Sequence, residues 1–264
     1  MRTLVIGDTH GAHKALKQVL ERCEFDYEND MLITIGDIVD GWGDSYMCVE
    51  ELLKIPNRID IMGNHDNWFR VFIETGVHEE RWRMGGLSTA KSYAKAAGIE
   101  LMVQKQLSKH FEPSDGFILN LNSGDIPESH KRFFSGQHKY YKDNDNNLFI
   151  HGGFNRHTPL REQLAYTFMW DRHLMTAAVS AKIHGPKLDY VEDFNQIFLG
   201  HTATQFFNAG DKPLHADIVW NVDTGAGASG GGKLTIMDVD TNEYWQSDVV
   251  KTLYPDDPHN IKYG

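Results

Sequence analysis

The chain has 264 residues, with 26 Lys and Arg against 37 Asp and Glu, a formal net charge of −11 and a hydrophobic content of 41%. This composition excludes disordered and fibrous proteins, and the length suffices for one large core, so we expect a single domain over residues 1–264. The acidic balance argues against non-specific binding to nucleic acid, because Lys and Arg supply most of that affinity.

The chain shows no pattern of membrane insertion or export. No run approaches the roughly 18 apolar residues that a membrane span needs, and the first residues begin a strand-like segment in place of a signal peptide. Cys23 and Cys48 lie in apolar, helix-like segments and are expected to be buried free thiols. Free thiols fit a reducing compartment, so we expect a cytoplasmic protein that does not bind membranes.

The first third of the chain alternates short apolar strands with amphipathic helices. Strands are predicted over 2–6, 31–35 and 58–62, and the helices between them over 14–23 and 45–54. This order is typical of an α/β sheet, which presents its ligand crevice at the carboxyl ends of the strands.

Residues 66–147 are predicted to form a mostly helical cap or insertion. Apolar spacing indicates helices over 88–97 and 104–111, and a polar connector occupies 113–130. Basic residues dominate the stretch 81–110, which keeps a nucleic-acid substrate open as an alternative.

The sheet pattern resumes after this insertion. Apolar strands over 148–150 and 197–199 are each followed by a histidine-containing turn. The tail over 216–248 alternates strands with turns, as antiparallel strands do.

Five segments place metal-binding residue types directly after apolar strands. These segments are Gly7-Asp8-Thr9-His10-Gly11, Gly36-Asp37-Ile38-Val39-Asp40, Gly63-Asn64-His65-Asp66, His151-Gly152-Gly153 and Gly200-His201-Thr202. One such turn is ordinary, but five of them together predict a metal centre. Carboxylate and amide oxygens combined with imidazoles suit Mn²⁺, Fe or Zn²⁺ and need no thiolate.

These motifs resemble those of the calcineurin-like metallophosphoesterases, and within them the phosphoprotein phosphatase family that includes the Ser/Thr protein phosphatases. Four further segments look like the bacterial and phage branch of that family: Trp82–Tyr93, Ile126–Phe134, Tyr140–Tyr141 and Asn221–Ala226. The resemblance implies a four-layer α/β/β/α sandwich with a helical cap and a two-metal site.

The resemblance also implies which residues hold the metals. One ion would be held by Asp8, His10 and Asp37, and a second by Asp37, Asn64, His151 and His201. Asp37 would bridge the two ions, and a hydroxide shared between them would be the nucleophile. Mn²⁺ is the expected metal, with Fe or Zn²⁺ as alternatives.

Three more residues match catalytic positions of the family. His65 matches the general acid that protonates the leaving oxygen, and Asp40 the carboxylate that hydrogen-bonds this histidine. Arg172 matches an arginine that binds phosphate oxygens, a task suited to the guanidinium fork. Each residue also has a purely structural interpretation. His65 could be a structural histidine, Asp40 a turn-capping aspartate, and Arg172 a surface arginine on a helix that begins near residue 171.

The sequence departs from the family at Gly41, where the pattern Gly-Asp-x-Val-Asp-Arg-Gly has arginine. Arg156 or a lysine of the 81–110 stretch is a candidate replacement for that phosphate-binding cation. Otherwise the site accepts a substrate of a different shape.

The resemblance implies hydrolysis of phosphomonoesters in a phosphoprotein or a small phosphoester, with phosphoserine or phosphothreonine in proteins as the expected substrate. The alternatives are a diadenosine tetraphosphatase, a nucleotide or nucleic-acid phosphodiesterase, and a non-catalytic phosphate-binding module. The tryptophans and tyrosines at 42, 68, 82, 93, 140, 141, 166 and 170 are expected to pack in the core or cap, with Trp42 alternatively lining the substrate groove.

Overall fold

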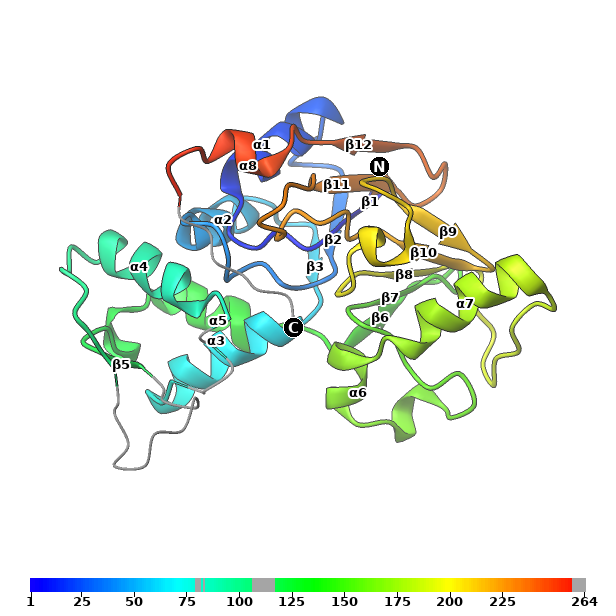
Figure 1. Cartoon of the computed structure of the whole chain (residues 1–264), viewed down its shortest axis with the longest axis horizontal. Helices are drawn as coiled ribbons and strands as arrows, with labels where there is room; N and C mark the ends of the chain where they lie inside the picture. Colours follow the sequence, from blue (N-terminus) through cyan, green and yellow to red (C-terminus); the bar gives the residue numbers. More distant parts are fainter. Residues whose placement is uncertain (79–81, 83, 106–116, 258–264) are drawn as a thin grey trace.

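The computed structural model describes residues 1–78, 82, 84–105 and 117–257. Within these residues, no helix is long and apolar enough to cross a membrane. The helices and strands form two central sheets, helices on the outer face of each sheet, and a lobe at one end (Figure 1).

The first sheet is built from the two ends of the chain. Its order is β12-β11-β1-β2-β3, where β1 (Thr3–Ile6), β2 (Met31–Thr34) and β3 (Arg58–Asp60) run parallel. Strands β11 (Thr235–Asp238) and β12 (Tyr244–Gln246) add to it antiparallel. Helices α1 (His13–Arg22) and α2 (Ser45–Leu52) connect the parallel strands, as parallel pairing requires, and α8 (Val250–Leu253) follows β12.

The second sheet has the order β6-β7-β8-β10-β9. Its strands are β6 (Tyr140–Lys142), β7 (Leu148–Ile150), β8 (Ile197–Leu199), β9 (Leu214–Ala216) and β10 (Val219–Asn221). Strands β7, β8 and β10 run parallel, and β6 and β9 flank them antiparallel. Helices α6 (Ala165–Trp170) and α7 (His173–His184) lie between β7 and β8 in the chain.

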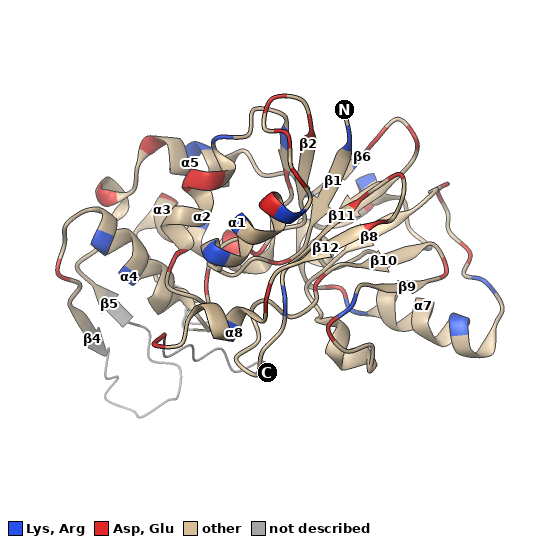
Figure 2. Cartoon of the chain, turned by 90° about the horizontal axis from the view of Figure 1, so that it is seen from above, with Lys and Arg blue, Asp and Glu red and all other residues tan. Residues whose placement is uncertain are grey.

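Alternation of side chains along each strand explains why the two sheets stack. In β7, Phe149 packs between the sheets against residues such as Val5, while Leu148 and Ile150 face the other way, toward the buried side chains of α6 and α7. Leu4, beside Val5 in β1, packs in the cluster that holds α1 and α2. Figure 2 shows the resulting order of helix, sheet, sheet and helix. This architecture confirms the expected α/β/β/α sandwich.

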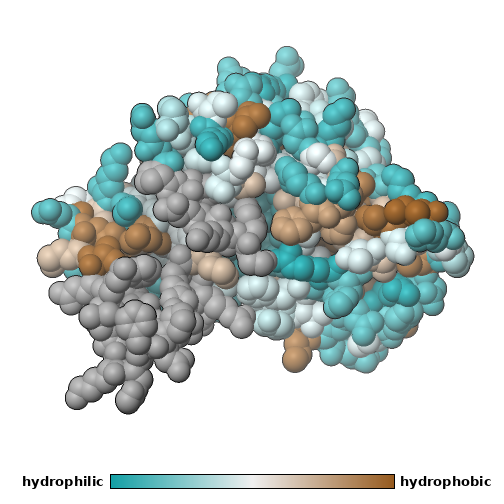
Figure 3. Space-filling view, viewed as in Figure 1, coloured by the Kyte–Doolittle hydropathy of each residue, from teal (hydrophilic) through white to brown (hydrophobic). Residues whose placement is uncertain are grey.

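The lobe consists mainly of α3 (Asn64–Thr75), α4 (Gly86–Ala96) and α5 (Glu128–Ser135). A hairpin of β4 (Val103–Lys105) and β5 (Phe117–Leu119) lies beside them. Brown apolar side chains gather on this lobe in Figure 3, and Met102 is one of its exposed residues.

The predicted helix over 104–111 is wrong at residues 104 and 105, which belong to β4. Pairing of Gln104 with Ile118 and of Lys105 with Phe117 outweighs the helical spacing of the sequence. Residues 106–111 lie outside the described part of the chain, as do Arg81, Arg83 and Lys109 of the basic stretch. Strand β6, although within 66–147, joins the second sheet rather than the lobe.

Two expectations about individual side chains have clear outcomes. Cys23 and Cys48 are buried free thiols, as predicted. Trp42 is fully buried, and its Nε1 donates a hydrogen bond to the carbonyl of Ala226 at 2.7 Å. Trp42 therefore belongs to the core and does not line a substrate groove.

Candidate metal centre

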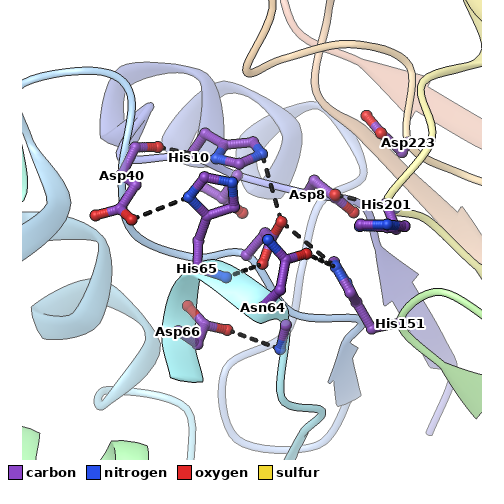
Figure 4. Close-up of polar contacts among 12 residues, drawn as sticks. Asp8, His10, Asp40, Asn64, His65, Asp66, His151, His201 and Asp223 are labelled. Carbon is purple, nitrogen blue, oxygen red and sulfur yellow. Dashed lines mark hydrogen bonds and ion pairs between the residues drawn. The ribbon is translucent and has the colours of Figure 1, made fainter. Parts of the chain in front are cut away.

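Strand ends from both sheets bring the predicted ligands to one place. Asp8 follows β1, Asp37 follows β2 and Asn64 begins α3 just after β3, while His151 and His201 follow β7 and β8 of the second sheet. Figure 4 shows the side chains of Asp8, Asn64, His151 and His201 converging, with His10 and His65 beside them. The site therefore lies where the carboxyl ends of the two sheets meet.

The backbone around the ligands is unusually constrained. His10, Asp37 and His201 have φ angles of 49°, 52° and 65°, in the left-handed region that non-glycine residues seldom adopt. At Gly200, a β-carbon would lie 2.1 Å from Oδ1 of Asp8, so no larger residue fits before His201. Such strained conformations cluster at functional sites.

Hydrogen bonds orient two of the histidines for metal binding. Nδ1 of His10 donates to the carbonyl of Asp40, and Nδ1 of His151 donates to the carbonyl of Ile35, both at 2.8 Å. Each ring therefore presents Nε2 as the nitrogen that can bind a metal. These Nε2 atoms lie 3.7 and 3.4 Å from Oδ2 of Asp37.

Two buried polar atoms at the site have no hydrogen-bond partner among the residues that the structure describes. They are Oδ1 of Asp8 and Nε2 of His201. Leaving such atoms unpaired in the interior is costly, whereas a cation would satisfy both. Candidate ligand atoms of Asp37, His151 and His201 lie within 4.8 Å of one another, and so do those of His10, Asp37 and His65. The residues therefore fit a pair of divalent cations that share Asp37.

Electrostatics also favour cations here. Burial, together with the charges of Asp223 and Asp37, raises the pKa of Asp8 well above its usual range. Burial likewise raises the pKa of Asp223 to about 6. For Asp37 the neighbouring histidines outweigh burial and hold the pKa below its usual range. Asp223 was not singled out from the sequence, although it lies in the Asn221–Ala226 motif.

His65 and Asp40 form a buried pair beside the candidate metal ligands. Nδ1 of His65 lies 2.9 Å from Oδ2 of Asp40, and its backbone N–H donates to Oδ1 of Asp37. The other carboxylate oxygen of Asp40 accepts hydrogen bonds from Trp82 Nε1 at 3.0 Å and Thr89 Oγ1 at 2.6 Å. Burial disfavours the charged imidazole, but Asp37 and Asp40 outweigh it, so the pKa of His65 is raised. Burial raises the pKa of Asp40.

Asp66 is a further site residue that the sequence analysis left without a role. Its carboxylate accepts hydrogen bonds from the N–H groups of Ile38, Val39 and Gly63 and from Nε2 of Gln137, at 2.9 to 3.3 Å. It thereby fixes the loop after β2 to the start of α3. The available signal was its spacing, three residues after Gly63, which is typical of an acidic residue that caps a helix.

The two candidate arginines lie in different surroundings. Arg172 immediately precedes α7, and its Nη1 donates to Thr202 Oγ1 and, at 3.5 Å, to the carbonyl of His201. Its charge contributes to lowering the pKa of His201, for which burial is the main cause. Arg156 instead has Nε 3.5 Å from Oδ1 of Asp189. The structure thus brings Arg172 to the site and engages Arg156 in an ion pair elsewhere.

The backbone at Gly41 accounts for the departure from the family pattern. Its φ is 119°, a conformation that residues with a side chain rarely adopt, and its N–H donates to Oγ of Ser88. An arginine at this position would be strained. The loop after Asp40 therefore has a conformation that favours glycine over arginine at this position.

Comparison with known proteins agrees with this geometry. The model of the calcineurin-like phosphoesterase family matches residues 1–205, so the chain belongs to that family. The chain superposes with a TM-score of 0.60 and 15% identity on a crystal structure assigned to a diadenosine tetraphosphatase, covering 93% of this chain and 92% of the other. A metallophosphoesterase from Sphaerobacter thermophilus gives a TM-score of 0.53 and 17% identity, with 94% and 89% covered.

Sequence relatives divide between two activities. A symmetrical bis(5'-nucleosyl)-tetraphosphatase from Dechloromonas aromatica is 36% identical over 79 residues, which are 29% of this chain and 28% of the relative. Serine/threonine-protein phosphatase 1 from Salmonella typhimurium is 29% identical over 106 residues, or 38% of this chain and 48% of the relative. The matched segments thus span less than half of either relative.

Proposed function

We propose that the chain is a two-metal hydrolase of phosphoesters. The observation that carries the proposal is the set of candidate ligands around Asp37, in which buried atoms of Asp8 and His201 lack partners within the described part of the chain. Asp8, His10 and Asp37 would hold one cation, and Asp37, Asn64, His151 and His201 the other. Mn²⁺ is the metal we would supply, because hard oxygens and imidazoles suit it.

The bound cations would supply charge for the phosphoryl group and activate the attacking water. Within the chain, Arg172 is the cation we assign to phosphate oxygens that the metals do not hold, since its planar fork can bind two oxygens together. Its hydrogen bonds to Thr202 and to the carbonyl of His201 would place it beside the ligand loop after β8.

His65 would complete the reaction as the general acid. The oxygen of the attacking water would form a bond to phosphorus as the bond from phosphorus to the leaving oxygen breaks. The proton of His65 would move to that leaving oxygen, and the proton released by the attacking water would restore the protonated histidine. Asp40 holds Nδ1 of the ring, so Nε2 would donate the proton. Trp82 and Thr89 in turn fix Asp40, which makes them positioning residues for the acid.

Two substrate classes compete within this proposal. The Salmonella relative favours phosphoserine or phosphothreonine in a protein, and the Dechloromonas relative favours a bis-nucleosyl tetraphosphate. Because substrate choice depends on loops and not on the metal ligands, the ligand set alone does not separate them.

The test is Mn²⁺-dependent hydrolysis of a phosphothreonine peptide, diadenosine tetraphosphate and bis-p-nitrophenyl phosphate, measured side by side. We expect turnover of at least one substrate that disappears on chelation and in Asp37→Asn. The dominant substrate identifies the class, and dominance of the diester would indicate a phosphodiesterase. Binding of Mn²⁺ without hydrolysis of any phosphoester would favour the non-catalytic module.

A further inference from the structure

Aromatic rings form a continuous row from the metal centre to the surface. The ring of His65 contacts that of Trp68, with centroids 4.6 Å apart, and Trp68 contacts Trp170 at 5.6 Å. Trp170 also meets the ring of His201 edge-on at 5.6 Å, and Tyr166 stacks on it at 5.8 Å with 23° between the planes. We refer to Trp68, Trp170 and Tyr166 as the aromatic row.

The row borders the proposed catalytic residues on two sides. Trp68 and His65 belong to α3, whereas His201 follows β8, so Trp170 spans from the lobe to the second sheet. Trp170 also lies two residues before Arg172, the proposed phosphate clamp. A substrate whose phosphate contacts Arg172 would therefore have these rings next to it.

Exposure increases along the row. Trp68 is buried, Trp170 is partly buried and Tyr166 is 57% exposed. The expectation that Tyr166 packs in the core or cap is therefore wrong, whereas Trp68, on the other side of Trp170, does pack there. Tyr166 and Trp170 are four residues apart in α6, which places them on one face of the helix. Because the Tyr166 ring already stacks on Trp170, binding of a ligand to this ring would cost little side-chain entropy.

We propose that Tyr166, supported by Trp170, stacks a nucleobase of the substrate, so that a nucleoside phosphate or polyphosphate is the preferred phosphoester. This inference rests on the proposed function, and it names the substrate class of the same site. Any nucleobase can stack on an aromatic side chain, and each stacked base strengthens binding about tenfold. A phosphoserine or phosphothreonine side chain offers no ring for this purpose.

The position of Tyr166 favours a nucleoside over a simple aryl phosphate. Tyr166 is two ring contacts away from His201, one of 5.6 Å and one of 5.8 Å. A ring bonded directly to the scissile oxygen would stay near the metals and Trp170. A base separated from the reacting phosphorus by a ribose and a phosphate chain would reach Tyr166.

Binding measurements test the stacking without requiring turnover. Isothermal titration would compare AMP with ribose 5-phosphate on the Mn²⁺-loaded protein and on Tyr166→Leu, Tyr166→Phe and Tyr244→Leu. Tyr244 is a partly exposed tyrosine on β12 and provides a matched control. We expect wild type to bind AMP about tenfold more tightly than ribose 5-phosphate, and only Tyr166→Leu to lose this preference. Equal affinities in wild type, or an unchanged preference in Tyr166→Leu, would overturn the proposal.

Kinetics then separate this inference from the function on which it rests. In Tyr166→Leu we expect the KM for diadenosine tetraphosphate to rise about tenfold with kcat unchanged, and the KM for a phosphothreonine peptide without aromatic residues to stay constant. Equal changes for both substrates would contradict a base-stacking role. If wild type hydrolyses neither of these substrates nor bis-p-nitrophenyl phosphate, the proposed function fails, while the ratio of AMP to ribose 5-phosphate affinity still decides the stacking.

Discussion

Gly63 lies so close to Asp37 that a β-carbon at residue 63 would be 2.0 Å from Oδ1 of the Asp37 carboxylate. The contact joins the end of β3 to the end of β2, and it holds the carboxylate that both proposed cations share. A methyl group at residue 63 can be accommodated only if Asp37 or the backbone moves.

We therefore expect Gly63→Ala to weaken Mn²⁺ binding at least tenfold, because the bridging carboxylate can no longer occupy its position. Isothermal titration with Mn²⁺ would measure the change. Gly124→Ala is the control, since among the described residues a β-carbon there meets only Asn122 Oδ1, at an ordinary 3.6 Å. Wild-type affinity in Gly63→Ala would show that Asp37 is not the shared ligand.

Asp37→Asn tests the same residue by removing its charge, whereas Gly63→Ala displaces its carboxylate. Replacing the carboxylate with a neutral amide removes the charge that lies between both proposed cations, so we expect loss of both metals and of nearly all hydrolysis. Metal analysis after gel filtration gives the number of ions per chain. Retention of two ions would show that the ligand assignment is wrong.

His65→Asn separates proton donation from metal binding. We expect metal content to be preserved, and turnover to fall by about 10²- to 10⁴-fold for substrates with alkyl leaving groups. The loss should be much smaller for p-nitrophenyl phosphate, whose leaving oxygen needs no proton. The measurement is kcat of wild type and of His65→Asn on an alkyl phosphate and on p-nitrophenyl phosphate. Equal losses on both would point to a structural histidine.

The convergence of the candidate ligands was predictable because each follows an apolar strand, and parallel strands end at one edge of a sheet. Strand limits were equally clear where apolar runs are bounded by turns, as in β7 and β8. The order α/β/β/α and the four layers followed from the family resemblance and are confirmed by the two stacked sheets.

Other features depend on contacts between distant residues, which local patterns do not contain. Thr89 donates a hydrogen bond to Asp40, which lies 49 residues earlier in the chain. Asp66 accepts one from the backbone of Ile38, 28 residues earlier. The φ of Gly41 is likewise set by its surroundings. The helix predicted over 104–111 is wrong at residues 104 and 105, because pairing of β4 with β5, rather than apolar spacing, decides their structure.

The last prediction concerns stability and lies away from the metal centre. Asp30 accepts hydrogen bonds from the side chain and backbone of Arg2, including one of 2.6 Å from Nη2, and from the backbone of Asp26. Burial alone would raise the pKa of Asp30, but the hydrogen bonds from Arg2 outweigh it and hold this pKa below its usual value. A carboxylate of this kind stabilises the fold above its unfolded pKa of about 3.9, and this contribution is lost as the pH falls through the lower, folded pKa.

We expect Asp30→Asn to lower the free energy of unfolding by about 1.5–3 kcal/mol at pH 7, the usual value of hydrogen bonds to a charged group. The difference from wild type should shrink as the pH falls below about 4, the unfolded pKa, since the unfolded chain then binds a proton at Asp30 before the folded protein does. Urea unfolding at several pH values would measure both effects, with Asp240→Asn at an exposed turn as the control. If the difference between wild type and Asp30→Asn were the same at pH 7 and pH 3, the ionised form of Asp30 would not be what stabilises the fold.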